Sequence, residues 1–251
     1  MVMMSRRHAI RTGPIGGQRL GDRDRQEDAW AVGVGEATGP WAAVADGVGG
    51  HPDGDRASQE AVAAVTPYLT SPDLGLRPEE WERWLMAGME AADIAVRRLS
   101  PAGFVGRPPA TTLVMAVGFR DLLCLAHIGD SRAYLVRGAA VKPLTIDMTP
   151  AGDRVAKGDP WETQNTASDS NILRACLGMD PLTVDRISVA WRPGDVLVLT
   201  SDGLNSIPLT AWPGLVRRPD PINAILDAHP WSDNATVALV PHPQSRLSRR
   251  P

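Results

Sequence analysis

The sequence is poor in cysteine and has no long apolar run. It contains two cysteines in 251 residues, Cys124 and Cys176, and neither belongs to a CxxC pair, which argues against a zinc finger or a thioredoxin-type site. No apolar stretch approaches the roughly 20 residues of a membrane span. The basic residues at the N-terminus are not followed by the apolar run of a signal peptide. We therefore expect a cytoplasmic protein with free, buried thiols.

A strong charge of either sign is also lacking. The 26 Lys and Arg residues nearly balance the 29 Asp and Glu residues, leaving a formal net charge of −3. This balance gives no general reason to expect a nucleic-acid partner. The chain has no GxxxxGK[ST] loop, so ATP-driven chemistry is not supported. Any affinity for cations must come from local clusters of acidic residues.

The length and the composition fit one large domain with a real core. Hydrophobic residues make up 43% of the chain, as in ordinary globular proteins. Residues 1–12 and 242–251 are polar, basic and rich in Pro, Ser or Arg, and we predict that both are flexible tails. Neither a repeat nor a low-complexity linker interrupts the stretch between them. We predict a single domain over residues 13–241.

Short apolar runs that end at turn residues predict eight strands, many of them without strict alternation, as in strands buried on both faces. The runs are 29–34, 41–45, 112–117, 122–128, 133–137, 187–191, 196–200 and 236–240. Helical periodicity predicts helices over 55–69 and 78–99, and more weakly over 221–228. Because the helices are grouped instead of alternating with strands, the pattern favours an α+β fold with antiparallel sheets.

Acidic residues recur where the predicted strands end. An apolar run leads directly into Asp46-Gly47 and Gly49-Gly50-His51, and another leads into Ser201-Asp202-Gly203. Three further acidic sites have the same placement: Glu27-Asp28, Asp130 and Asp233. Carboxylates that converge on one rim repel each other, and a divalent cation relieves that repulsion. Carboxylate and carbonyl oxygens are hard ligands suited to Mg²⁺ or Mn²⁺.

Each of these residues also has a purely structural interpretation. A single Asp-Gly is often a plain turn, and His51 could be a solvated loop residue. His127 lies inside a predicted strand, where a packed core residue is the simpler interpretation. Arg132 could bind phosphate, but an internal ion pair with a nearby carboxylate is favoured. Asp53 and Asp55 could be metal neighbours, but a solvated loop and the start of a helix are favoured.

Eight motifs in order carry a family resemblance. They are RDRQEDA (23–29), DGVGGH (46–51), ATT (110–112), GDSRAY (129–134), LTID (144–147), ILRACLG (172–178), SDGL (201–204) and SDNAT (232–236). With these motifs the chain resembles the type 2C family of metal-dependent serine/threonine phosphatases, of the bacterial type. The resemblance covers nearly the whole predicted domain. It implies a four-layer α-β-β-α sandwich, in which helices flank two antiparallel sheets.

The resemblance also implies a ligand set. Two Mn²⁺ or Mg²⁺ ions are expected at Asp46, which bridges them, the Gly47 carbonyl, Asp202 and Asp233. Asp28 is expected to reach a metal through water, with Glu27 at the same rim and Asp130 binding a third, weaker metal. Arg23 matches the phosphate-binding arginine of the family, and His51 is expected to protonate the leaving oxygen. The implied reaction is attack of a metal-bridging hydroxide on phosphoserine or phosphothreonine, without a covalent intermediate.

The chain departs from the family pattern beside the expected active site. Met148 replaces the usual histidine after Asp147, and the polar segment that follows, up to Asn171, corresponds to a mobile flap. The expected partners are phosphorylated proteins, either a Ser/Thr kinase or its targets or a partner-switching regulator, with no nucleic acid and no membrane. Two other functions remain open: a phosphatase-like binding module without turnover, and a two-metal hydrolase of small phosphoesters or nucleotides.

Overall fold

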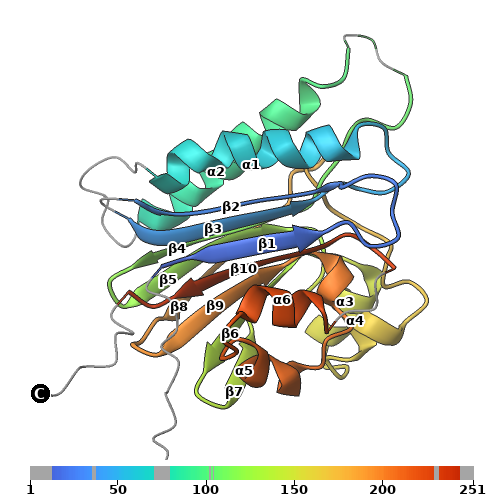
Figure 1. Cartoon of the computed structure of the whole chain (residues 1–251). Helices are drawn as coiled ribbons and strands as arrows, with labels where there is room; N and C mark the ends of the chain where they lie inside the picture. The colour runs from blue at the N-terminus through green and yellow to red at the C-terminus, as the bar shows by residue number, and fades with distance from the viewer. Residues whose placement is uncertain are drawn as a thin grey trace, which may run out of the picture.

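The computed structural model describes residues 13–35, 38–70, 80–101, 103, 105–228 and 232–243. Within these residues two antiparallel sheets of five strands each lie face to face (Figure 1). The first, called the β9 sheet, has the order β1 (Ile15–Arg19), β10 (Ala235–Pro241), β9 (Asp195–Thr200), β6 (Arg132–Arg137) and β7 (Ala140–Pro143). The second, called the β3 sheet, has the order β2 (Asp28–Gly35), β3 (Gly39–Asp46), β4 (Leu113–Phe119), β5 (Leu122–Ile128) and β8 (Asp185–Ala190).

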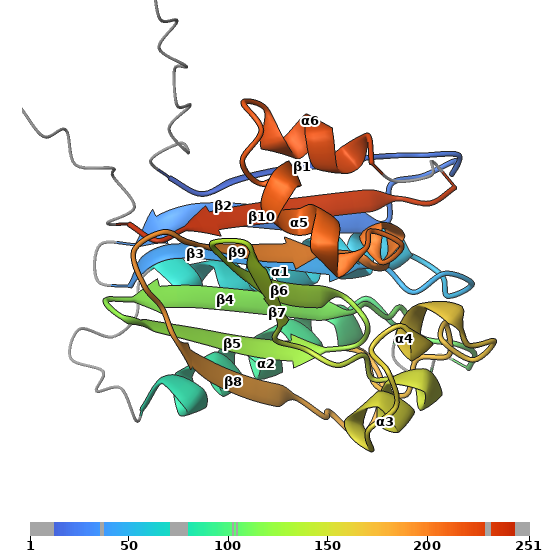
Figure 2. The same cartoon turned by 90° about the horizontal axis from the view of Figure 1, so that it is seen from below.

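Helices cover the outer face of each sheet. The long helices α1 (Gly54–Thr70) and α2 (Trp81–Arg97) lie on the β3 sheet, and the short helices α5 (Trp212–Leu215) and α6 (Pro221–Leu226) lie on the β9 sheet (Figures 1 and 2). Two more short helices, α3 (Pro150–Ala156) and α4 (Thr163–Thr166), stand at one end of the sandwich. The expected four-layer α-β-β-α arrangement is confirmed.

Three layers of apolar side chains hold the sandwich together. One lies between the sheets and includes Val44, Leu125 and Leu199, all fully buried. The other two lie between each sheet and its helices, with Met115 under α1 and α2 and Val237 under α5 and α6. Central strands therefore bury both faces, which explains why their sequences are apolar without alternating. Residues 242 and 243 follow β10, and His242 is only 4% exposed.

All eight predicted strands are present, and two strands were missed. β1 has the sequence IGGQR, and its glycines weaken the strand signal. Those glycines are required, because a Cβ at Gly16 would overlap the ring of Trp30. β7 is only four residues long and ends in Pro143. A weak signal of this kind is difficult to distinguish from a loop.

The predicted helices are also present, with additions in the flap segment. The predicted helix 221–228 corresponds to α6, and the first two residues of the predicted helix 78–99 lie outside the described residues. In the flap segment, α3 begins at a recognisable cap, where Thr149 Oγ1 accepts a hydrogen bond from Gly152 N at 3.0 Å and Pro150 occupies the first turn. These capping residues were the available signal for α3.

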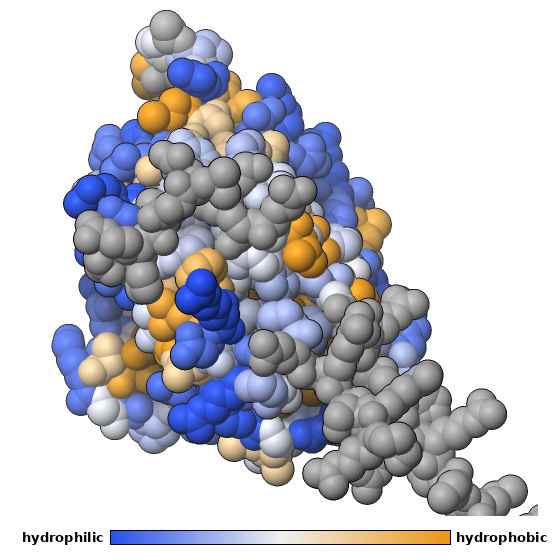
Figure 3. Space-filling model, turned by 90° about the vertical axis from the view of Figure 1, so that its left-hand side faces the viewer, coloured by the Kyte–Doolittle hydropathy of each residue, from blue (hydrophilic) through white to orange (hydrophobic). Residues whose placement is uncertain are grey.

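Hydrophobic surface residues are scattered at one end of the sandwich. Figure 3 shows the end of the sandwich away from α3 and α4, where hydrophobic residues form separate small patches among hydrophilic ones. No helix in the described part of the chain is long and apolar enough to cross a bilayer. The predicted tails fall outside the described residues, except for residues 242 and 243.

Candidate metal centre and active site

Strand register brings the predicted acidic residues to one edge of the sandwich. β2 and β3 are antiparallel with Asp28 opposite Asp46, so the start of one strand meets the end of the other. In the β9 sheet, β9 and β10 are also antiparallel, and Asp202 follows the end of β9 while Asp233 precedes the start of β10. Asp130 lies in the connection between β5 and β6.

Asp28 joins the two sheets at this edge. Its Oδ2 atom accepts hydrogen bonds from Ser201 Oγ and Thr236 Oγ1, each at 2.7 Å. Ser201 directly follows β9 and Thr236 lies in β10, whereas Asp28 begins β2, so these hydrogen bonds connect the two sheets at this edge. The Asp28 residue is 3% exposed, and its second oxygen, Oδ1, has no hydrogen-bond partner. Ser201 and Thr236 were not predicted as site residues, although both belong to recognised motifs.

Two threonines hold the backbone of Asp46. Its N–H donates to Thr112 Oγ1 at 3.0 Å, and its carbonyl accepts from Thr112 N and Thr111 Oγ1, both at 2.8 Å. The Thr112 hydroxyl also lies 2.7 Å from Ser131 Oγ, next to Asp130. The ATT motif therefore clamps the end of β3 and connects it to the turn that carries Asp130.

The glycines that follow the aspartates are required by close backbone packing. A Cβ at Gly47 would overlap the Gly54 carbonyl, and a Cβ at Gly203 would overlap the Asn234 carbonyl. Neither glycine has a positive φ, whereas Gly50 in the same loop as Gly47 has φ 78°. Gly203 thus allows the end of β9 and the start of β10 to approach closely enough to place Asp202 beside Asp233.

Four carboxyl groups at this edge have raised pKa values. Burial raises the pKa of Asp28 from 3.8 to about 7, although hydrogen bonds from Thr236 and Ser201 oppose the shift. Burial is the main cause of the raised pKa at Asp46 as well, followed by the negative charges of Asp28, Asp202 and Asp130. The pKa values of Asp130 and Asp202 are raised mainly by burial too. Ionising these groups together is unfavourable without a compensating cation.

The donor chemistry of the edge fits a hard divalent cation. Every candidate ligand is a carboxylate or carbonyl oxygen, and Asp28 Oδ1 is buried without a partner. Among the described residues, however, no three Asp, Glu, His or Cys side chains form a ready-made ligand cluster. Asp233 turns toward Arg23, whose Nη2 lies 2.7 Å from Asp233 Oδ2. The predicted phosphate-binding and metal-binding residues thus contact each other directly.

Asn234 fixes the loop that carries Arg23 and Glu27. Its Oδ1 accepts a hydrogen bond from Glu27 N at 2.7 Å, and its Nδ2 donates to the carbonyls of Leu20 at 2.7 Å and Arg25 at 3.0 Å. The Glu27 carboxylate faces Gly54, where a Cβ would come within 3.1 Å of Glu27 Oε1. The asparagine of the SDNAT motif therefore positions the residues around Asp233 without being a ligand itself.

His51 is oriented by a single backbone contact. Its Nδ1 lies 2.7 Å from the Pro108 carbonyl oxygen. Because a carbonyl accepts only, Nδ1 carries the hydrogen, and Nε2 is the atom available for proton exchange. Among the described residues no hydrogen bond or ion pair joins His51 to the aspartates, so its role remains a prediction.

The structural interpretations of the other residues are confirmed. His127 is fully buried, and burial lowers its pKa to about 4. Arg132 is 1% exposed and forms a two-pronged ion pair with Asp147, with Nε–Oδ1 and Nη2–Oδ2 distances of 2.8 and 2.6 Å. Asp53 pairs loosely with Arg56 at 3.8 Å, and Asp55 lies in the first turn of α1. Both cysteines are free and buried.

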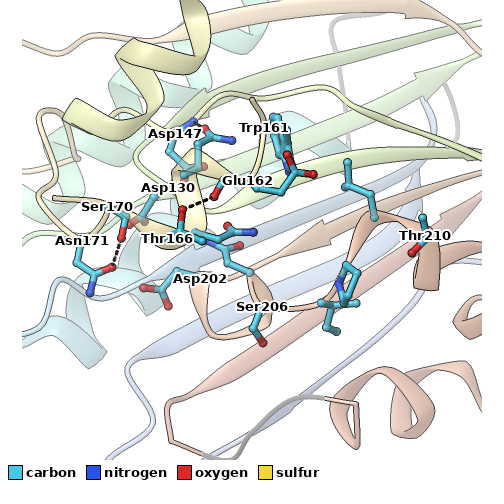
Figure 4. A pocket seen from close by; sticks show the side chains of 16 residues that line it. Asp130, Asp147, Trp161, Glu162, Thr166, Ser170, Asn171, Asp202, Ser206 and Thr210 are labelled. Carbon is cyan, nitrogen blue, oxygen red and sulfur yellow. Dashed lines mark hydrogen bonds between the residues drawn. The ribbon is translucent and has the colours of Figure 1, made fainter. Parts of the chain in front are cut away.

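A pocket of about 570 Å³ opens beside the aspartates (Figure 4). Asp130 and Asp202 form part of its lining, together with residues of the flap segment and of the segment that follows Asp202. Met148 attaches the start of the flap to the Asp130 turn, because its N–H donates to the Gly129 carbonyl at 2.8 Å and its Sδ accepts from Gly129 N at 3.5 Å. Methionine therefore occupies the expected histidine position as a packing residue.

The fold and this edge define the class of protein, namely a sandwich whose clustered carboxylates suit metal-assisted hydrolysis. The model of the family described as protein phosphatase 2C matches residues 15–235. The chain belongs to the protein phosphatase 2C family, which is metal-dependent, and the sequence-based resemblance is confirmed.

Two bacterial relatives support the family assignment, and a solved structure supports the fold. The serine/threonine phosphatase Stp of Listeria monocytogenes is 29% identical over 228 residues, covering 87% of this chain and 90% of that protein. PstP of Mycobacterium tuberculosis is 34% identical over 167 residues, covering 65% of this chain and 31% of that protein. The crystal structure of Stp1 from Staphylococcus aureus superimposes with a TM-score of 0.80 at 23% identity, covering 96% of this chain and 99% of that chain.

Proposed function

We propose that the chain hydrolyses phosphoserine and phosphothreonine in phosphorylated proteins, with two divalent cations held at the acidic edge. The observation that carries this proposal is the convergence of Asp28, Asp46, Asp130 and Asp202, whose pKa values are all raised. A protein that keeps four such carboxylates together is adapted to bind cations there. The named activities of the Listeria and Mycobacterium relatives support the same substrate class.

The chain's own residues divide the work between metal binding and substrate binding. Asp46, the Gly47 carbonyl, Asp202 and Asp233 would hold two Mn²⁺ or Mg²⁺ ions. Asp28 would contribute through water. Glu27 would stand at the rim, and Asp130 would take part in a third, weaker site. When bound, the ions supply an activated water near neutral pH and positive charge beside the phosphoryl oxygens.

Arg23 and His51 would act on the phosphate ester itself. The Arg23 side chain is 48% exposed and its guanidinium lies beside Asp233, so it can donate to phosphate oxygens at the same edge. As the imidazolium, with hydrogens on both ring nitrogens, His51 would deliver its Nε2 proton to the leaving serine or threonine oxygen. Neither cysteine is suited to nucleophilic attack, since burial raises the pKa of Cys124, and raises that of Cys176 to about 11.

Phosphate release with and without Mn²⁺ tests the proposal. The substrates are p-nitrophenyl phosphate, a phosphothreonine peptide, a nucleotide and a sugar phosphate. We expect Mn²⁺-dependent hydrolysis of the peptide that EDTA abolishes, and a loss of at least about a hundred-fold in the Asp46→Asn, Asp202→Asn double variant. Asp53→Asn is the matched control, because Asp53 lies in the same loop as Asp46 but is exposed and forms an ion pair with Arg56. Activity that survives EDTA, or that is confined to nucleotides, would refute the proposal.

A further inference from the structure

The pocket beside the aspartates is placed to receive more than a phosphate. It shares Asp130 and Asp202 with the candidate metal centre and extends away from them between two segments, 161–171 and 205–210. In Figure 4, Asp130 and Asp202 lie toward one side of the pocket and Thr210 toward the other. A phosphorylated residue held at Asp202 would therefore direct the neighbouring part of its chain into this space.

The lining of the pocket changes character along its length. Ser170 and Asn171 stand on the side of the aspartates, whereas the apolar residues Ile207, Pro208 and Leu209 lead on to Thr210 at the other side. Among the described residues that line it there is no lysine or arginine, and Glu162 adds a carboxylate. The far part of the pocket thus favours an apolar side chain and disfavours an acidic one.

Contacts inside the protein hold Trp161 and α4, which form one wall of the pocket, in place before any substrate binds. The Trp161 ring lies against the buried Arg132 guanidinium, 5.4 Å from the ring centroid, and 6.4 Å from the ring of Tyr134. Gln164 Oε1 accepts a hydrogen bond from Asp147 N at 2.7 Å, which attaches α4 to the same ion pair. Ile207, in the other segment that lines the pocket, is 5% exposed. Binding to a wall fixed in this way requires little ordering of the protein.

We propose that this pocket selects the substrate by a residue that flanks the phosphorylated serine or threonine. It accepts a large apolar side chain between Trp161 and Leu209 and rejects a carboxylate at the same position. The inference deepens the proposed function and rests on it. A pocket of this kind supports selection on the order of ten- to a hundred-fold in kcat/KM.

A set of matched phosphothreonine peptides tests the selection. Each position near the phosphothreonine is changed in turn to leucine or glutamate, and kcat/KM is measured with Mn²⁺. We expect one position at which leucine is preferred over glutamate by about ten-fold or more. p-Nitrophenyl phosphate, which has no flanking residues, serves as the reference substrate for the chemical step.

Two exposed residues of the lining allow the preference to be redesigned. Thr210→Lys places a positive charge at the far end of the pocket, and Ser206→Lys does so at a second exposed position. We expect both variants to reduce or reverse the preference for leucine over glutamate, measured within each variant as the ratio of kcat/KM for the two peptides. Thr70→Lys is the matched control, since Thr70 is exposed at the end of α1 in the opposite helical layer.

The possible results distinguish a failure of the pocket assignment from a failure of the proposed phosphatase function. A wild-type protein that hydrolyses no phosphopeptide would contradict the proposed function. Hydrolysis of every peptide at the same kcat/KM would contradict the pocket assignment alone. The assignment would also be overturned if both lysine variants fold and keep the wild-type preference.

Discussion

Arg23 and a bound cation would compete for the Asp233 carboxylate. Its Oδ2 atom accepts from Arg23 at 2.7 Å, and its Oδ1 accepts from Asn234 N at 2.8 Å. A cation that binds Asp233 must share the carboxylate with the guanidinium and bear its positive charge nearby. Arg23 therefore influences the metal centre as well as the phosphate, and its two effects have opposite signs.

Removing Arg23 should separate these effects. In Arg23→Ala we expect tighter Mn²⁺ binding by calorimetry, up to about five-fold, because a half-exposed ion pair contributes ~0–1 kcal/mol. The same variant should have a higher KM for phosphopeptides, since a phosphate ligand is lost. Arg25→Ala removes an equal charge from the same exposed loop and should change Mn²⁺ affinity less. Unchanged or weaker Mn²⁺ binding in Arg23→Ala would count against competition at Asp233.

The charge of Asp202 should destabilise the protein when no cation is bound. With EDTA present, Asp202→Asn should melt a few degrees above the wild type, at roughly 2–4 °C per kcal/mol for a chain of this size. Mn²⁺ should no longer raise its melting temperature as it raises that of the wild type. Differential scanning calorimetry with EDTA and with Mn²⁺ measures both effects.

Asp195 provides a control for which the expected change in melting temperature has the opposite sign. It is 1% exposed like a core residue, but it forms a two-pronged ion pair with Arg137 at 2.7 and 2.6 Å. Asp195→Asn should lower the melting temperature in EDTA and keep the Mn²⁺-induced increase. If Asp202→Asn behaved like Asp195→Asn, Asp202 would be a structural carboxylate and not a metal ligand.

At the scale of elements, the site depends on how closely β9 and β10 approach. Gly203→Ala would force a Cβ against the Asn234 carbonyl, so we expect a loss of about 1–3 kcal/mol in the free energy of unfolding. Mn²⁺ affinity should fall with it, because Asp202 and Asp233 would be moved apart. Urea unfolding and calorimetry report the two quantities separately.

Gly214→Ala is the matched control for this prediction. Gly214 lies in α5, and a Cβ there has no heavy atom within 4 Å. Alanine favours a helix over glycine by about 1 kcal/mol, so this variant should be neutral or slightly more stable. Equal effects of the two substitutions would show that the contact at Gly203 does not position the aspartates.

The elements were predictable where their pattern was long or strongly apolar. The eight predicted strands and the helices α1 and α2 have continuous apolar runs or stripes, whereas β1 and β7 are short and contain glycine or proline. The site was predictable in composition but not in geometry. Strand order determines that Asp28 and Asp46 are neighbours, and nothing local to Ser201 or Thr236 indicates that they contact Asp28.

Local sequence patterns also did not predict the pocket. Its lining comes from a polar flap segment and from residues after Asp202, and neither has a strong periodic signal. Trp161 packs against Arg132 at the start of β6, and Arg132 forms an ion pair with Asp147. Contacts between distant segments of this kind depend on the completed fold, and the sequence alone predicted only the Arg132 ion pair.

At the scale of the whole molecule, the buried carboxylates link stability to pH. The pKa of Asp28 is about 7 in the folded chain against an ordinary value of 3.8, so the folded state holds more protons than the unfolded state between these values. Stability without a cation should therefore fall as pH rises from about 4 to 7. His127 acts in the opposite direction, because its lowered pKa removes stability as pH falls from 6.5 toward 4.

The difference in stability between the metal-bound and the metal-free protein reports on the carboxylates alone, since His127 contributes equally to both states. A cation competes with protons for Asp28, Asp46 and Asp202, so its affinity should rise as these groups ionise. We expect the increase in melting temperature caused by Mn²⁺ to be small near pH 5 and to grow up to about pH 7.5. Calorimetry across this range, with EDTA and with Mn²⁺ at each pH, measures the increase. A Mn²⁺ effect independent of pH would mean that the cation binds away from the buried carboxylates, and the candidate metal centre would have to be placed elsewhere.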